Sequence, residues 1–199
     1  METITAIETR RSIRKYTPDP ICREDILKII GSALKAPSAK NRQPWRFVVV
    51  TGESKKGMLL SMREGLLREE SDPLLPGSAR YLSGARHTLS IMEEAPVTLF
   101  IINKERKTED LPVDMESYFY QSANLQSLGA CIQNMLLAAT ELGYGSLWNC
   151  DIFFAYREIS AWLETDEQVV AAVSFGVPAE NPAARPRKSL GDTVEWKAP

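Results

Sequence analysis

Histidine and cysteine, which supply most transition-metal ligands and many catalytic groups, are scarce in this chain of 199 residues. His87 is the only histidine, and Cys22, Cys131 and Cys150 lie far apart and form no metal-binding spacing. We therefore expect no metal site and no disulfide framework. An odd number of scattered cysteines favours a reducing environment inside the cell.

Long hydrophobic runs are also missing. No apolar stretch approaches the roughly 18 residues that a membrane-spanning helix needs. Near the N-terminus, Glu8 and the arginines interrupt Ile4, Ala6 and Ile7, so no secretory signal is expected. The net charge of -2 argues against a broad nucleic-acid-binding surface. These absences predict a cytoplasmic protein with neither membrane nor nucleic acid as a partner.

Several motifs of enzyme active sites are absent from the sequence. It contains no GxGxxG, GxxxxGK[ST], GxSxG or HExxH pattern. A Ser-His-Asp triad would depend on His87, whose neighbours carry no nucleophile motif. If the chain is an enzyme, we expect a cofactor rather than a side chain to supply the reactive group.

Hydrophobic patterning predicts helices that alternate with short β-branched strands. We expect helices at about 3–13, 23–33, 55–70, 83–93, 115–142 and 155–162, strands at 46–51, 97–102, 146–149 and 169–175, and loops at 36–44, 72–77 and 103–114. This order favours an α+β fold in which helices wrap a sheet, as one domain over residues 1–199.

The stretch TRRSIRKY, residues 9–16, gathers four cations around the hydroxyl of Ser12. Guanidinium groups and a hydroxyl are the donors that a phosphate monoester needs. If this stretch is helical, Arg10 and Arg14 share one face, where their like charges repel unless an anion lies between them. A solvated polar face explains the same residues. A second basic run, ARPRKSL at 184–190, is remote in sequence, and two such runs are enough to enclose one phosphate.

Two further stretches suit a flat ligand. APSAKNRQPW has two prolines, which stiffen the loop, and side chains that donate and accept hydrogen bonds along the edge of a heterocycle. ELGYGSLWNCD, residues 141–151, leads from a helix end into a strand, and its glycines let the backbone approach a ligand. A structural connector and a simple helix end are the alternative interpretations.

From about Thr5 to Val194, the chain resembles the FMN-dependent nitroreductase family. The resemblance is carried by segments in this order: RRSIRKY, APSAKNRQPWRFVVV, QNMLLAATELGYGS, GVPAE and RPRKSL. The resemblance implies a nitroreductase-like α+β fold, with a central, mainly antiparallel sheet wrapped by helices, and an intertwined homodimer with FMN at the subunit interface. It implies that residues 53–94 form a variable region that covers the substrate, and that the tail, 177–199, reaches the partner subunit.

The implied activity is a ping-pong reaction in which NADH or NADPH reduces the flavin and a small oxidised molecule, such as a nitroaromatic or a quinone, then accepts the electrons. No catalytic side chain is expected, because flavin N5 is the reactive centre. The alternatives are another chemistry on the same fold, such as dehalogenation or enone reduction, and an FMN-binding protein without turnover. A nucleic-acid-binding domain is disfavoured. The substrate, the choice between NADH and NADPH and the role of His87 stay open.

The resemblance also assigns residues to the cofactor. Arg10, Ser12 and Arg187 would hold the FMN phosphate with Arg11 close by, and Arg14 would approach the N1/C2 edge of the ring. The ring would be lined by the partner subunit's loop and by the backbone of a strand end: Pro37, Ser38, Ala39, Asn41 and nearby Gln43 from the loop, and Trp148, Asn149 and Cys150 from the strand end.

Overall fold

Four antiparallel strands form the central sheet, in the order β1-β2-β4-β3. Their bounds are Trp45–Thr51 for β1, Val97–Lys107 for β2, Gly145–Asn149 for β3 and Glu167–Gly176 for β4. This computed structural model describes residues 2–74, 77–108 and 112–197. The predicted α+β fold with a mainly antiparallel sheet is confirmed.

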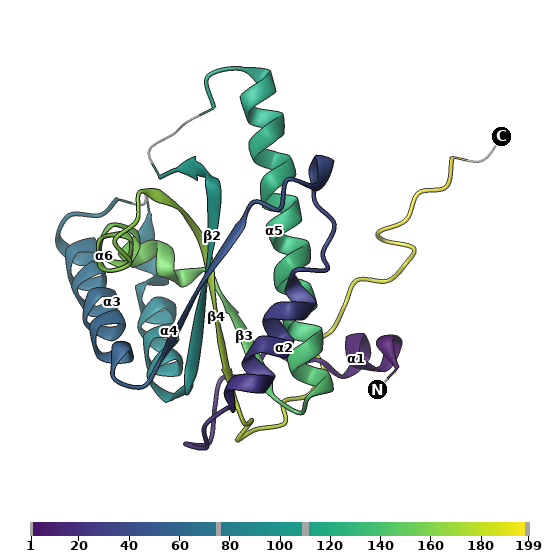
Figure 1. The fold of residues 1–199 in the computed structure, drawn as a ribbon, viewed down its shortest axis with the longest axis horizontal. Helices are drawn as coiled ribbons and strands as arrows, with labels where there is room; N and C mark the ends of the chain where they lie inside the picture. Colours follow the sequence, from purple (N-terminus) through teal and green to yellow (C-terminus); the bar gives the residue numbers. More distant parts are fainter. Residues whose placement is uncertain (1, 75–76, 109–111, 198–199) are drawn as a thin grey trace.

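Helices cover both faces of the sheet (Figure 1). One face carries α3 (Ser54–Ser71), α4 (Leu82–Glu94), α6 (Tyr156–Trp162) and the short 3-10 helices η2 (Ser78–Tyr81) and η3 (Asp151–Ala155). The other face carries α2 (Arg23–Ala33) and the long α5 (Met115–Glu141), against which α1 (Thr3–Thr9) and the 3-10 helix η1 (Ala39–Asn41) also pack.

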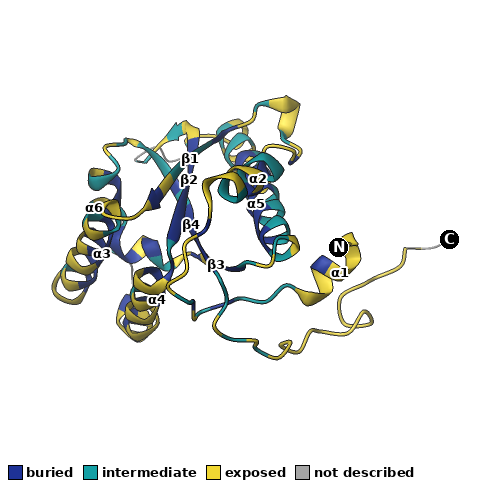
Figure 2. Cartoon of the chain, turned by 60° about the horizontal axis from the view of Figure 1, so that its bottom comes forward, coloured by how far each residue is buried: buried dark blue, intermediate teal, exposed yellow. Residues whose placement is uncertain are grey.

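The core lies in two layers, one on each face of the sheet. In β2, Leu99 and Ile101 pack toward α2 and α5, whereas Phe100 and Ile102 pack toward α3 and α6. This strand is buried on both sides, as its continuous β-branched and aromatic run predicts. Figure 2 shows buried residues along the strands and the inward faces of the helices, while α1 and the C-terminal segment are mostly exposed.

The helix predicted for residues 3–13 ends early, at Thr9. Residues 12 to 17 instead run alongside the sheet: Ile13 N–H donates to the Ser146 carbonyl at 3.0 Å, and Thr17 N–H donates to the Val177 carbonyl at 2.9 Å. These long-range hydrogen bonds satisfy the backbone better than an exposed helix end does. The predicted helical face shared by Arg10 and Arg14 is therefore wrong.

The loop predicted for residues 103–114 begins too early, because β2 continues to Lys107. Asn103 is fully buried, and its Nδ2 donates to Gln168 Oε1 of β4 at 3.1 Å. Lys107 at the strand end pairs with Asp166 at 2.7 Å. Residues 103–107 therefore form a strand despite their polar sequence, because pairing with β4 decides their conformation. Residues 109–111 of this predicted loop, and 75–76 of the loop predicted at 72–77, lie outside the described residues.

The segment after β4 first pairs with the N-terminal part of the chain and then leaves the body of the molecule (Figure 1). Ala179 N–H donates to the Lys15 carbonyl at 2.9 Å. Further along, Leu190 and Trp196 are 80% and 87% exposed. Within the residues that the structure describes, no helix has the length and apolar character needed to cross a membrane.

Candidate functional site

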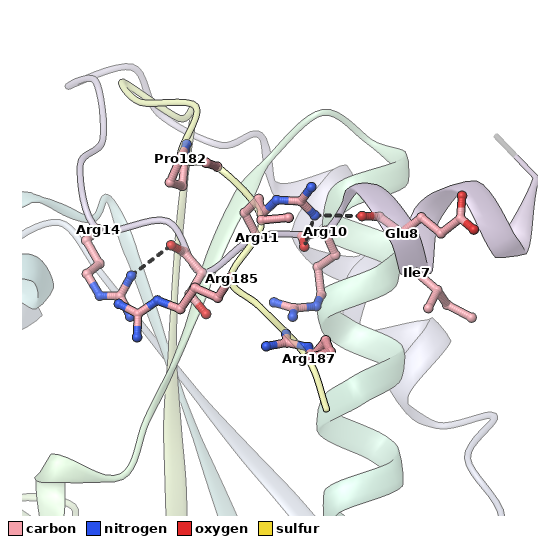
Figure 3. Close-up of a pocket in the computed structure, with 11 residues that line it drawn as sticks. Ile7, Glu8, Arg10, Arg11, Arg14, Pro182, Arg185 and Arg187 are labelled. Carbon is pink, nitrogen blue, oxygen red and sulfur yellow. Dashed lines mark hydrogen bonds between the residues drawn. The ribbon is translucent and has the colours of Figure 1, made fainter. Parts of the chain in front are cut away.

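A cavity of about 280 Å³ lies between the N-terminal segment and the segment that follows β4 (Figure 3). The two basic runs of the sequence meet here, from opposite ends of the chain. The lining consists of Ile7, Glu8, Arg10, Arg11, Ser12, Arg14, Pro182, Ala183, Ala184, Arg185 and Arg187. Five arginines around one hollow make this the most cationic of the described cavities.

Buried contacts fix the extended segment that carries the N-terminal arginines. Ile13 and Tyr16 are both 7% exposed and pack with Leu147 at the end of the sheet. The Tyr16 hydroxyl donates to the Ile13 carbonyl at 2.9 Å. A Cβ atom on Gly145 would lie 2.8 Å from the Ile13 side chain, so this close approach requires glycine. This anchoring places Arg10, Arg11, Ser12 and Arg14 along the cavity.

The arginines repel one another across the cavity. Burial and the positive charges of Arg187 and Arg11 lower the pKa of the Arg10 guanidinium. Figure 3 shows the guanidinium groups of Arg10 and Arg187 next to each other, and the Glu8 carboxylate pointing away from them. An anion between Arg10 and Arg187 would replace this repulsion with two attractions, so the arrangement is suited to an anionic group such as a phosphate.

Internal hydrogen bonds orient two of the arginines. Arg11 Nη1 donates to the carbonyl of Glu8 at 2.6 Å. The Arg14 backbone N–H donates to Glu180 Oε1 at 2.5 Å, and Arg14 Nη1 donates to the Ser12 carbonyl at 3.1 Å. Arg14 is therefore held in place by contacts on both its backbone and its side chain.

The predicted ring-lining loop lies apart from this cavity. None of Pro37, Ser38, Ala39, Asn41 and Gln43 belongs to the lining, and η1 of this loop packs instead against α5. Ser38 Oγ accepts the Gln43 N–H at 3.0 Å, and apart from half-buried Ser38 these residues are exposed. Their role toward a ligand stays a prediction.

The strand end formed by Trp148, Asn149 and Cys150 also lies outside the lining. Asn149 is 2% exposed, and its Nδ2 donates to Ser174 Oγ at 2.8 Å, so this amide nitrogen is held by the neighbouring strand β4. Trp148 is 38% exposed, and Cys150 is exposed. Although the residue as a whole is exposed, desolvation of its thiol and the nearby Asp151 carboxylate raise the pKa of Cys150.

The sequence assigned some residues of these regions no contact with the cofactor. Arg185 lines the cavity as part of the second basic run, which the sequence already marked as an anion-binding candidate. Arg42 joins the predicted ring-lining loop to Glu105 and Tyr120, and no local pattern marks a contact among three separate elements. Over the described ranges, no group of three or more His, Cys, Asp or Glu residues is placed to hold a metal ion.

The comparisons with known proteins agree with this fold. The model of the nitroreductase family matches residues 7–177. A protein of Methanothermobacter thermautotrophicus named "Putative NADH dehydrogenase/NAD(P)H nitroreductase" is 30% identical, over 93% of this chain and 82% of its own length. The crystal structure of a BluB-like flavoprotein from Clostridium difficile 630 is 28% identical, covers 100% of both chains and has a TM-score of 0.80.

A second solved structure has a bound cofactor. It is that of "a putative nitroreductase in complex with fmn" from Desulfovibrio desulfuricans, which is 26% identical, with a TM-score of 0.74 over 100% of this chain and 99% of that chain. The family model covers most of the sequence, and the sheet order and helical layers are those of a nitroreductase-like fold. The chain therefore belongs to the nitroreductase family.

Proposed function

We propose that this chain is an FMN-dependent oxidoreductase that takes a hydride from NADH or NADPH and reduces a small oxidised molecule, such as a nitroaromatic or a quinone. The arginine cavity is the observation that carries the proposal, because it gathers donors suited to a phosphate monoester. Two relatives support the choice of cofactor and donor: the Desulfovibrio desulfuricans protein is in complex with FMN, and the Methanothermobacter protein is named for NADH and NAD(P)H.

The residues of the cavity fit the FMN phosphate by charge and by donor type. A phosphate monoester carries about -1.5 to -2 charges at pH 7. Arg10 and Arg187 supply neighbouring guanidinium groups, Ser12 supplies a hydroxyl, and Arg11 and Arg185 add further positive charge to the lining. We assign the phosphate to Arg10, Ser12 and Arg187 for this reason.

Arg14 is assigned to the N1/C2 edge of the flavin ring. When bound, FMN supplies a two-electron acceptor that takes a hydride at N5 and returns the electrons to a second substrate. Negative charge grows at the N1/C2 edge during reduction, and a fixed guanidinium stabilises that charge without reorganising. The hydrogen bonds from Arg14 to Glu180 and Ser12 hold the group for this purpose. The exposed loop containing Ser38 and Asn41 would line the ring.

The separation of that loop from the cavity favours a homodimer in which each subunit completes the other's site. Apolar side chains that a monomer leaves in water support the same assembly: Ile4 and Ile7 on α1 are 64% and 50% exposed, and Leu190 and Trp196 of the C-terminal segment are more exposed still. The segment after β4 extends away from the body of the molecule (Figure 1), as expected of a segment that reaches a partner subunit. Light scattering after size-exclusion chromatography tests this: a mass of twice 22.3 kDa is expected, and a monomer contradicts it.

Anaerobic titration of the FMN-loaded protein tests the activity. NADH or NADPH should bleach the flavin absorption, and a nitroarene or a quinone should restore it. Bound FMN that neither nucleotide bleaches would identify a non-catalytic FMN-binding protein. Bleaching that only a halogenated substrate or an enone reverses would assign one of the other chemistries.

A further inference from the structure

The loop predicted to line the flavin has an unusual backbone. Lys40, Asn41 and Gln43 have φ angles of 51°, 53° and 50°, in the left-handed region that residues other than glycine rarely adopt. Three such residues within four positions need outside contacts to hold them, and strain of this kind is concentrated at functional sites. Arg42 lies between them with ordinary helical angles, φ -66° and ψ -28°.

The side chain of Arg42 connects this loop to two other elements. Its guanidinium carbon lies 4.1 Å from the centroid of the Tyr120 ring on α5. Its Nη1 lies 3.7 Å from Glu105 Oε2 on β2, and both charged side chains are less than one-third exposed. A guanidinium is suited to this place because it stacks on an aromatic face and keeps its N–H groups directed in its own plane.

The acceptor is itself held in place. Asn124 Nδ2 on α5 donates to Glu105 Oε2 at 3.1 Å, and the Glu105 backbone N–H donates to Asn103 Oδ1 at 3.3 Å. Asn124 is 5% exposed, so it forms a rigid support for the carboxylate. The Arg42 anchor therefore rests on a fixed strand and a fixed helix.

Hydrogen bonds inside the loop couple the position of Arg42 to that of Ser38, Asn41 and Gln43. The Arg42 N–H donates to the Ala39 carbonyl at 3.1 Å, and the Asn41 N–H donates to the Ser38 carbonyl at 2.9 Å. The Gln43 N–H closes the loop on Ser38 Oγ at 3.0 Å. Since Arg42 stands between Asn41 and Gln43, displacing its side chain frees the loop to relax toward ordinary φ angles.

We propose that Arg42, acting through Tyr120 and Glu105, is a positioning residue that fixes the orientation in which Ser38 and Asn41 meet the flavin ring. This inference rests on the proposed FMN-dependent function and adds a determinant outside the arginine cavity. Arg42 acts through the loop and is not assigned a contact with the cofactor.

Four variants test the proposal: Arg42→Ala, Arg42→Lys, Glu105→Gln and the control Lys35→Gln, which removes one exposed positive charge just before the loop without touching Tyr120 or Glu105. The first readout is amide hydrogen exchange of residues 38–43 in FMN-free protein. We expect exchange at Asn41 and Gln43 to accelerate at least tenfold in Arg42→Ala, by a smaller factor in Arg42→Lys and Glu105→Gln, and not in Lys35→Gln.

The second readout is the visible circular dichroism and midpoint potential of bound FMN, measured at saturating FMN. Both should shift in Arg42→Ala and be partly restored in Arg42→Lys, while the melting temperature changes little. Unchanged exchange in both Arg42 variants and in Glu105→Gln would refute the anchor. Faster exchange with an unchanged flavin spectrum and potential would refute the positioning role.

The two proposals fail differently. A wild-type protein that takes up no FMN refutes the proposed function, and the role of Arg42 toward the flavin falls with it, whatever the loop exchange shows. A wild-type protein that binds FMN while the Arg42 variants match it in both readouts refutes only the inference about Arg42.

Discussion

Replacement of Arg187 by alanine tests the arginine cavity, because it should weaken FMN binding while leaving the free energy of unfolding almost unchanged. The charge of Arg187 lowers the pKa of Arg10, so the two guanidinium groups repel in FMN-free protein. Arg187 is exposed, and its loss should change the free energy of unfolding by no more than about 0.5 kcal/mol. Loss of a charge-assisted hydrogen bond to phosphate costs about 1.5–3 kcal/mol. The dissociation constant of FMN should therefore rise roughly 10- to 150-fold.

The assay is a titration that follows quenching of FMN fluorescence at two salt concentrations, beside chemical denaturation of the FMN-free proteins. Arg10→Ala should weaken binding in the same range. Lys15→Ala is the control, because Lys15 belongs to the same basic stretch but is exposed and lies outside the cavity lining. The salt dependence of binding should be weaker in Arg187→Ala, because fewer charges contribute to attraction. Wild-type affinity in Arg187→Ala, or an equal loss in Lys15→Ala, would refute the assignment of the phosphate to this cavity.

Three further predictions concern the supports of the site. Tyr16→Phe removes the hydrogen bond from the buried hydroxyl to the Ile13 carbonyl and should lower the free energy of unfolding by about 0.5–1.5 kcal/mol in chemical denaturation. The exposed control Tyr118→Phe should leave it unchanged, and equal free energies of unfolding for the two variants would contradict this. Gly145→Ala forces a Cβ against Ile13 and should cost about 1–3 kcal/mol by the same measurement, so unchanged stability would argue against the close approach. The raised pKa of Cys150 should make its alkylation at pH 7 slower than that of a free cysteine and faster as the pH rises. Asp151→Asn removes one cause of the raised pKa and should speed the reaction at pH 7, as followed by mass spectrometry; no acceleration would exclude that cause.

The sequence predicted most of the fold because most elements carry local patterns. The β-branched runs that became β1 and β4, and the long apolar stretch that became α5, needed no tertiary information to be recognised. The errors at residues 10–13 and 103–107 have a common cause. In both places, pairing with a strand or segment distant in the sequence outweighs local propensity, so the short helix is cut and a polar run becomes a strand.

The candidate site was predictable in composition but not in geometry. Both basic runs were recognised as anion-binding candidates, yet only the path of the segment after β4 shows that Arg10 and Arg187 line the same cavity. The contact of Arg42 with Tyr120 and Glu105 depends on the packing of a loop, a helix and a strand. No local sequence pattern predicts a contact among these three elements.

The visible absorption spectrum of the purified protein tests the central claim most directly. We predict a yellow protein with an FMN-type spectrum, from which denaturation releases FMN in an amount equimolar with the chain. A colourless protein that takes up no added FMN would contradict the account.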